Sequence, residues 1–445
     1  MKEQFLNRMK EYLGNEYEAY EHSLQQPRFR GLRVNETRCS IQRFLELAPW
    51  QCEPSPICPQ SFYIKEEHVG NHPLHLSGTF YMQEPSASSA VEVLDVKEGE
   101  WVLDLCAAPG GKSTQIAAKL HHSGFLLSNE IDKKRVLALL SNMERLGFSE
   151  YAITNETPQK LCRKLQGCFD KVLVDAPCSG EGMFKKHEQA IEDWSEEQVL
   201  FCAKRQREIL HEAYQALRPG GTMVYSTCTY AKEENEETIA AFLQEHADME
   251  LIDCNVSFGR CGLPDTGIDV SKVRRIFPMD GGEGHFIAKM KKKGEGERRH
   301  LKEVKQSKTD PLTEAFFKGQ LKEGDPCVMQ QGTKVYARMQ PFVVLDGLQV
   351  IRQGVLCGEI VKKRFEPHQH FYTAGIHQAK LSHVYEMSLS ECEQFLKGYP
   401  LAASLRGFVC LCYQGFPLGF GKGDGSWIKN RYPKGLRNSE QVKLC

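Results

Sequence analysis

Two cysteines that each follow a short apolar run are the residues best placed to do chemistry. Cys178 lies in DAPCSGEG (175–182), after the run KVLV, and Cys228 lies in YSTCTY (225–230), after TMV. A thiolate is a strong nucleophile, and a helix N-terminus or a nearby cation can lower its pKa. The alternative is that both are small buried apolar residues, since the chain has 17 cysteines. Their polar turns at two strand ends favour a crevice with thiol chemistry.

A glycine turn, VLDLCAAPGGKST (102–114), precedes both cysteines. Its apolar run, turn and following helical run predict a strand and a helix start, whose free backbone N–H groups attract a polar ligand. The turn lacks both GxGxxG and GxxxxGK[ST], because Cys106 stands where the second pattern requires glycine. Glu130 ends the next apolar run, where a carboxylate can bind two ribose hydroxyls. These features favour S-adenosylmethionine over NAD or ATP.

A thiol beside a methyl donor suits the methylation of cytosine. C5 of cytosine is too weak a nucleophile to attack a sulfonium methyl group unless a thiolate first adds to C6 and makes C5 enamine-like. Methyl transfer, loss of the C5 proton and elimination of the thiol then complete the reaction. Asp175 could hold the N3/N4 edge of the base, and Lys112 could orient it. The residues alone do not decide which cysteine attacks.

Strands and helices alternate between residues 100 and 291, which predicts an α/β fold with a parallel sheet covered on both faces. Ligands of such sheets bind at the carboxyl ends of the strands, where the turns described above fall. We expect strands at 101–105, 125–129, 151–154, 170–174, 222–227, 249–252 and 285–290, and helices at 112–121, 133–146, 196–217 and 233–246.

The N-terminal part has a different pattern. Residues 1–25 have helical periodicity, Leu32 and Val34 indicate a strand, and Ser40 is a helix cap before Ile41–Leu47. Residues 50–75 are typical of a loop, and the segment from Gly78 leads into a further helix. Four arginines could contact phosphates or equally form surface salt bridges: Arg28, Arg30, Arg33 and Arg38.

The charge is unevenly distributed although the net charge is −1. Residues 291–445 carry 25 Lys and Arg against 15 Asp and Glu, whereas the rest of the chain carries 32 against 43. The basic part favours a polyanionic partner, or it is simply a solvated face. Residues 289–310 are almost wholly charged and predict a linker. A second α/β-like region follows, with expected strands near 326–329, 333–338 and 342–351, and a last apolar strand at 407–413.

Several classes of protein are disfavoured. The cysteines lack CxxC…CxxC spacing, so we expect no zinc site. The first residues have no apolar signal core, and no run of about 18 apolar residues predicts a membrane span. We therefore expect a cytoplasmic monomer with free thiols, no metal and no membrane contact.

Five motifs resemble, in chain order, those of the Sun-type RNA (cytosine-5) methyltransferase family: DLCAAPGGKSTQIA, LSNEIDKKRV, LVDAPCSGEGMFKK, LRPGGTMVYSTCTY with the following EEN, and GHFIAKM. GLRVN and GTFYMQEPSA resemble its N-terminal motifs, and KNRYPKGLR resembles the PUA-like module of the bacterial F-type 16S ribosomal RNA members. The resemblance implies a Rossmann-like S-adenosylmethionine methyltransferase with a small N-terminal α+β RNA-binding domain (1–75), a methyltransferase domain (76–291), a charged linker (292–312), an accessory α/β domain (313–385) and a PUA-like module (386–445).

The resemblance also implies residue roles. Cys228 would attack the base, Cys178 would assist proton removal or product release, and Asp175 and Lys112 would lie beside the target base. Many members have an acidic turn that contacts adenine, for which Asn155 or Glu156 could serve here. The residues expected to bind the cofactor are Cys106, Ala107, Ala108, Pro109, Gly110, Gly111, Lys112, Glu130, Arg135 and Asp175.

The function implied is formation of 5-methylcytosine in small-subunit (16S) ribosomal RNA. The same motifs would serve a transfer RNA methyltransferase, and a non-catalytic RNA-binding assembly factor is the alternative from another class, against which the two cysteines argue. Trp427 and Tyr432, beside Lys429, Arg431 and Lys434, could stack a base of the RNA, or equally pack in a core.

Overall fold

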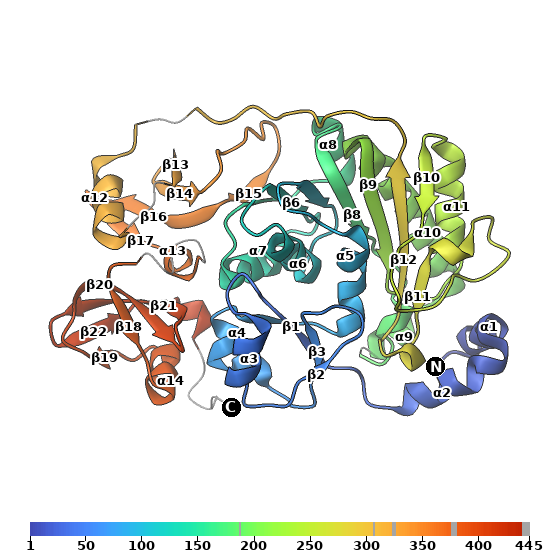
Figure 1. The fold of residues 1–445 in the computed structure, drawn as a ribbon, viewed down its shortest axis with the longest axis horizontal. Coiled ribbons are helices and arrows are strands. Elements are labelled where there is room, and N and C mark those ends of the chain that lie inside the picture. Colours follow the sequence, from blue (N-terminus) through green and yellow to red (C-terminus); the bar gives the residue numbers. More distant parts are fainter. Residues whose placement is uncertain (187, 306–307, 323–325, 375–380, 438–445) are drawn as a thin grey trace.

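The computed structural model describes the chain except residues 187, 306–307, 323–325, 375–380 and 438–445. A nine-stranded sheet lies at its centre, in the order β10-β12-β9-β8-β5-β6-β7-β15, with β11 on β12 (Figure 1). Its middle strands, β5 to β9, are parallel, as the alternation predicts, and the seven expected strands are confirmed. With β11, which was not expected, the bounds are β5 Trp101–Asp104, β6 Phe125–Asn129, β7 Tyr151–Thr154, β8 Phe169–Asp175, β9 Leu217–Thr227, β10 Met249–Ile252, β11 Arg274–Ile276 and β12 His285–Lys292.

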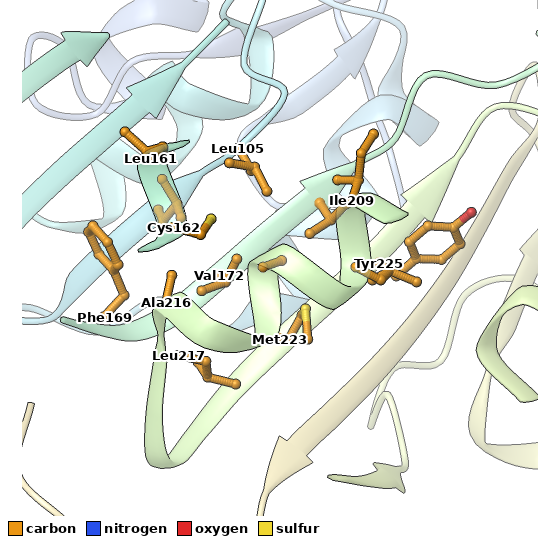
Figure 2. Close-up of a cluster of buried hydrophobic side chains, with 14 of the residues drawn as sticks. Leu105, Leu161, Cys162, Phe169, Val172, Ile209, Ala216, Leu217, Met223 and Tyr225 are labelled. Carbon is orange, nitrogen blue, oxygen red and sulfur yellow. The ribbon is translucent and has the colours of Figure 1, made fainter. Parts of the chain in front are cut away.

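Helices cover both faces of this sheet. One face packs on α5, α6 and α7, and the other on α8, α10 and α11, so alternate residues of a strand enter two separate cores, as Val102 and Leu103 do. Figure 2 shows the second face, where Cys162 and Ile209 lie over Val172 and Met223. The bounds are α5 Ser89–Leu94, α6 Gly111–Lys119, α7 Arg135–Leu146, α8 Pro158–Lys164, α9 Glu188–Asp193, α10 Glu196–Ala216 and α11 Glu236–Glu245.

The N-terminal part forms a small antiparallel sheet in the order β2-β3-β1-β4. The Ser40 side chain accepts a hydrogen bond from the Arg43 N–H, which confirms it as the cap of α3. Residues 50–75, expected as loop, also contain β2, β3 and α4. The bounds are α1 Glu3–Leu13, α2 Tyr17–Gln25, β1 Gly31–Val34, α3 Ile41–Leu47, β2 Glu53–Pro54, β3 Ser61–Tyr63, α4 Pro73–Leu76 and β4 Phe80–Met82.

Two of the four N-terminal arginines join parts of the protein, so the expectation that they contact phosphates is wrong for them. Arg33 is 2% exposed and donates to the Gly111 carbonyl at 3.0 Å and to Thr114 Oγ1 at 2.8 Å. Arg38 donates to the Leu146 carbonyl at 2.9 Å and to the Thr373 carbonyl. These guanidinium groups donate hydrogen bonds to buried carbonyl groups. Composition alone cannot distinguish such arginines from surface arginines.

The described parts of the charged linker between β12 and α12, residues 293–305 and 308–310, run along the top of the view in Figure 1. Arg299 fastens it to the central domain by donating to the Gln166 carbonyl at 2.8 Å. The accessory sheet that follows is antiparallel, in the order β13-β14-β16-β17. The bounds are α12 Pro311–Gln320, β13 Cys327–Gln331, β14 Lys334–Arg338, β16 Val355–Val361, β17 Arg364–Pro367 and α13 Gln369–Thr373.

One strand of the accessory region belongs to another sheet. The strand expected at 342–351 is wrong in extent: only β15, Val350–Gln353, is a strand, and it pairs antiparallel with β7 of the central sheet. The Arg338 guanidinium also reaches the central domain, where it lies 2.9 Å from the Glu150 carboxylate. The accessory region therefore completes an edge of the central sheet.

The last module is a five-stranded sheet in the order β18-β20-β21-β22-β19. Tyr432 is 6% exposed and packs in its core, so it offers no ring to a ligand, whereas Trp427 is 51% exposed. Within the described residues, no helix is long and apolar enough to cross a membrane. The bounds are β18 Val384–Glu386, α14 Leu389–Lys397, β19 Leu401–Ala402, β20 Arg406–Tyr413, β21 Phe416–Asp424 and β22 Trp427–Asn430.

Candidate active site

Two cavities meet at the carboxyl ends of the parallel strands. Cavity 1 has a volume of about 1160 Å³ and cavity 2 of about 690 Å³. Cys106, Asp175 and Cys228 line both of them. Cavity 1 extends past Glu130 and along α10, whereas cavity 2 extends past Lys112 toward the N-terminal domain. Two ligands could therefore meet at Cys228.

The glycine turn separates the two cavities. Of the residues expected to bind the cofactor, some line cavity 1 and others cavity 2. Gly110 lines neither of them: it has a φ of +111° at the start of α6, and a Cβ there would lie 3.1 Å from Leu139 Cδ1. Glu130 and Arg135 line cavity 1, Ala107, Pro109, Gly111 and Lys112 line cavity 2, and Ala108 lines both.

The Glu130 side chain is fixed at the wall of cavity 1. It is 3% exposed and accepts from the Asp132 N–H at 2.9 Å and the Ala108 N–H at 3.2 Å. Arg135 Nη1 lies 3.6 Å from its Oε2, and Arg135 also donates to the Ala108 carbonyl at 2.6 Å. A carboxylate has about four lone-pair positions. Glu130 therefore keeps acceptor capacity for hydroxyl groups in the cavity.

The two side chains considered for a contact with adenine, those of Asn155 and Glu156, instead form hydrogen bonds within the protein. Asn155 donates to the Glu130 carbonyl at 2.7 Å. Glu156 accepts from the Gln349 N–H and from Lys160 Nζ, each at 2.7 Å. Neither Asn155 nor Glu156 lines cavity 1. They instead hold the β6–β7 edge, where the accessory region docks.

The two cysteine sulfurs lie 3.3 Å apart. The hydrogen bond between the two thiols lowers the pKa of Cys228 against the opposing effects of burial and Asp175, and the Lys112 ammonium group lowers it further. The same hydrogen bond and burial raise the pKa of Cys178, which also lies near the Glu234 carboxylate. These opposite directions favour the thiol form of Cys178 and the thiolate form of Cys228. This arrangement favours Cys228 as the nucleophile, a choice that the residues alone left open.

A buried ion pair lies beside the thiols. Asp175 Oδ2 accepts from Lys112 Nζ at 2.7 Å, and its Oδ1 accepts from Ser226 Oγ at 2.7 Å. Burial alone would raise the pKa of Asp175, but Lys112 outweighs it and the pKa is lowered. Burial likewise opposes the charge of Lys112, and Asp175 raises its pKa. Both groups are therefore charged, with Lys112 directed at the site of Cys228.

Two buried glutamates that sequence reasoning missed hold the cysteine turns together. The Ser179 N–H donates to Glu234 Oε2 at 3.0 Å, which joins the Cys178 turn to the segment after Cys228. Glu181 accepts from the Tyr230 N–H at 2.8 Å and from Arg8 of α1. Their only signal in the sequence is proximity to the two cysteine motifs.

One group of the described residues could hold a metal ion: the ligand atoms of His211, Glu245 and His246 lie within 4.8 Å of one another. Two of the three side chains are exposed. The absence of a metal therefore stays a prediction.

Models of four protein families match successive parts of the chain. Residues 1–85 match the N-terminal domain of 16S rRNA methyltransferase RsmF, and residues 91–291 match 16S rRNA methyltransferase RsmB/F. Residues 315–374 match the RsmF rRNA methyltransferase first C-terminal domain, and residues 382–438 match the methyltransferase RsmF PUA domain.

Curated relatives match over nearly the whole chain. Ribosomal RNA small subunit methyltransferase F of Klebsiella pneumoniae (strain 342) is 34% identical over 93% of this chain and 91% of its own length. The protein of the same name from Salmonella agona (strain SL483) is 32% identical over 97% and 95%.

Solved structures agree in fold. A methyltransferase homolog protein from Pyrococcus horikoshii is 29% identical, with a TM-score of 0.58 over 66% of this chain and 95% of its own. NSun6 from the same organism, 22% identical with a TM-score of 0.58 over 66% and 99%, shares the fold. The chain belongs to the RsmB/F family of 16S rRNA methyltransferases, with the N- and C-terminal domains of its RsmF members.

Proposed function

We propose that the protein methylates C5 of a cytosine in 16S ribosomal RNA, with S-adenosylmethionine as the methyl donor and a covalent bond from Cys228 to C6 of the base. The observation that carries this proposal is the Cys178–Cys228 pair, 3.3 Å apart, at the junction of two cavities. One cavity suits the donor and the other suits the base.

S-adenosylmethionine fits cavity 1. Glu130 would bind the ribose hydroxyls with its spare acceptor positions, while Ala108 and Arg135 hold the carboxylate in place. Cys106 and Asp175 would lie beside its methionine part, at the junction of the cavities. When bound, the donor supplies an electrophilic methyl group next to Cys228. The other turn residues shape the start of α6 beneath it.

The residues at the junction divide the remaining work. The hydrogen bond with Cys178 and the Lys112 ammonium group favour the thiolate form of Cys228, whose sulfur can add to C6. Asp175, ionised by Lys112, accepts hydrogen bonds from the exocyclic amino group of cytosine, which uracil lacks. Cys178 keeps its proton and donates it toward the sulfur of Cys228, which favours release of the completed base.

The RNA would approach through cavity 2. Arg28 and Arg30 line its outer part, and phosphate contacts there would position the RNA without reading its sequence. The target base must leave its stack, which costs on the order of a few kcal/mol, so a loop or helix end is the easier target. The relatives named for the small ribosomal subunit share all the modules of this chain, which supports ribosomal RNA over transfer RNA.

Two measurements test the proposal. Bisulfite sequencing of RNA from a deletion strain should show loss of a 5-methylcytosine from 16S ribosomal RNA. Loss of a transfer RNA site with ribosomal sites intact would contradict the substrate.

Denaturing gels of protein with RNA test the mechanism. Cys178→Ala should accumulate a covalent protein–RNA adduct, and Cys228→Ala should give neither adduct nor methylation. Cys392→Ala, a buried cysteine of the last module, is the matched control and should behave as the wild type. An active Cys228→Ala protein would contradict the assignment.

A further inference from the structure

We propose that His285, Ser86 and Glu84 form a proton relay that removes the C5 hydrogen of the target cytosine. The inference rests on the proposed function, to which it adds the group that takes this proton. The three residues come from two motifs, GHFIAKM and QEPSA, at opposite ends of the catalytic domain. No step described so far uses any of the three side chains.

His285 and Cys228 lie next to the end of one strand pairing. On β12 and β9, the last pair is Phe286 with Thr227, so His285 and Cys228 are the next residues outward along the two segments. His285 and Cys228 also line the same cavity, cavity 2, together with Lys112 and Asp175. The imidazole therefore lies in the cavity proposed for the target base.

Hydrogen bonds fix which nitrogen of His285 can accept a proton. Ser86 Oγ donates its single proton to Glu84 Oε2. The contact of 3.0 Å between Ser86 Oγ and His285 Nδ1 must then be donated by the imidazole. Nε2 therefore carries no hydrogen and presents a lone pair.

The environment keeps this imidazole neutral and supplies a final acceptor. Burial and, to a smaller extent, the Lys112 ammonium group lower the pKa of His285 to about 3, against the opposing effect of the Asp175 carboxylate. Burial raises the pKa of Glu84 to about 7. Glu84 is therefore the stronger base of the two, and His285 conducts the proton to it through Ser86.

The arrangement of the cavities selects the side of the ring from which the proton leaves. Asp175 and Cys228 line both cavities, whereas His285 and Glu84 line cavity 2 alone. When C5 of the cytosine receives the methyl group from the side of cavity 1, C5 becomes tetrahedral. Its hydrogen then points to the opposite side of the ring. That side faces the relay.

The step balances in protons and electrons. The C5 proton passes to His285 Nε2 while Nδ1–H passes to Ser86 Oγ and the hydroxyl proton passes to Glu84. The electron pair of the C5–H bond forms the C5–C6 double bond. The C6–S bond breaks, and its electron pair leaves on Cys228 as thiolate. Glu84 ends as a neutral carboxyl group and His285 as its other neutral tautomer.

The relay can be tested without a methyl donor, because a Cys228 adduct exchanges its C5 hydrogen with water through the same groups. The full-length protein is incubated with 16S ribosomal RNA transcribed with [5-³H]cytidine. Adduct on a denaturing gel and tritium released to water are both measured. General-base catalysis contributes about 10²–10⁴-fold. His285→Phe should therefore still form adduct but release tritium about 100-fold more slowly, and Ser86→Ala should slow release about tenfold or more.

Rescue separates a lost base from a distorted site. Added imidazole should restore tritium release to His285→Ala, which leaves space for it, and not to His285→Phe. His75→Phe, whose half-buried ring lies outside both cavities, should release tritium as the wild type does.

Three results would overturn the relay alone: undiminished release by His285→Phe, an equal loss of adduct and release, or no rescue by imidazole. A wild-type protein that forms no adduct and releases no tritium would instead overturn the proposed function.

Discussion

Replacing Arg338 with Met should loosen the accessory region from the catalytic sheet. The Arg338 and Glu150 side chains are 1% and 4% exposed, and their atoms approach to 2.9 Å. Glu150 also accepts from the Met339 N–H at 2.8 Å and the Gln340 N–H at 3.3 Å. Removing one partner of a buried ion pair costs about 3–5 kcal/mol. Because two N–H donors still stabilise Glu150 in Arg338→Met, we expect the lower end, about 3 kcal/mol.

Replacing Glu150, the other partner of the ion pair, should lower the stability of the docking by a larger amount. Glu150→Leu leaves a buried guanidinium and two unpaired N–H groups, so about 5 kcal/mol is expected. The double variant leaves only the two N–H groups and should cost less than the sum of the singles, with a coupling of about 2 kcal/mol or more.

Hydrogen exchange of the β15 and β7 peptides measures this docking directly. A cost of about 3 kcal/mol raises the frequency of local opening by about 100-fold. Arg364→Met is the matched control, because the Arg364 side chain is 71% exposed and such surface pairs contribute about 0–1 kcal/mol. Exchange of β15 within twofold of the wild type in Arg338→Met would refute the reasoning.

Three further predictions concern the cavities and the RNA. Glu130→Gln should weaken S-adenosylmethionine binding by about 10–100-fold in titration calorimetry, because hydrogen bonds to charged groups contribute about 1.5–3 kcal/mol each; unchanged affinity would remove Glu130 from the site. Iodoacetamide should alkylate Cys228 at lower pH than an ordinary thiol, since a lowered pKa keeps the thiolate as the pH falls. Lys112→Met should move that titration to higher pH, and an unmoved midpoint would exclude the lysine as its cause. Trp427→Ala should weaken RNA binding by about 1–3 kcal/mol in filter binding without changing the melting temperature, whereas Tyr432→Ala should lower the melting temperature.

Local patterns were enough to predict which residues gather at the candidate site. β5, β8 and β9 contain apolar runs that end in polar turns, and parallel strands of this type bring their carboxyl ends to one edge. The predicted site residues Cys106, Asp175 and Cys228 meet there for that reason. The lowered pKa of Cys228 and the raised pKa of Cys178 depend on the contact between the two thiols and on the Lys112 and Glu234 charges near them, which no spacing encodes.

Contacts between distant segments were beyond the reach of such patterns. Arginine is usually a surface residue, and the burial of Arg33 follows from its hydrogen bonds to the Gly111 carbonyl and the Thr114 hydroxyl of α6, 78 and 81 positions away. β15 has no periodicity that distinguishes its partner, because an edge strand can pair with any exposed edge. The relay of Glu84, Ser86 and His285 likewise joins two motifs whose spacing carries no chemical pattern.

The pairing of β15 with β7 has a consequence for synthesis of the chain. β7 ends at Thr154, and its partner begins at Val350, about 200 residues later. At about 5–20 residues per second, the ribosome needs on the order of 10–40 s to make that stretch. During this time one edge of the nascent catalytic sheet has unpaired N–H and C=O groups, which are prone to pair with other chains. Synthesis of β15 and its pairing with β7 thus end the period in which the unpaired edge makes the growing chain prone to aggregation.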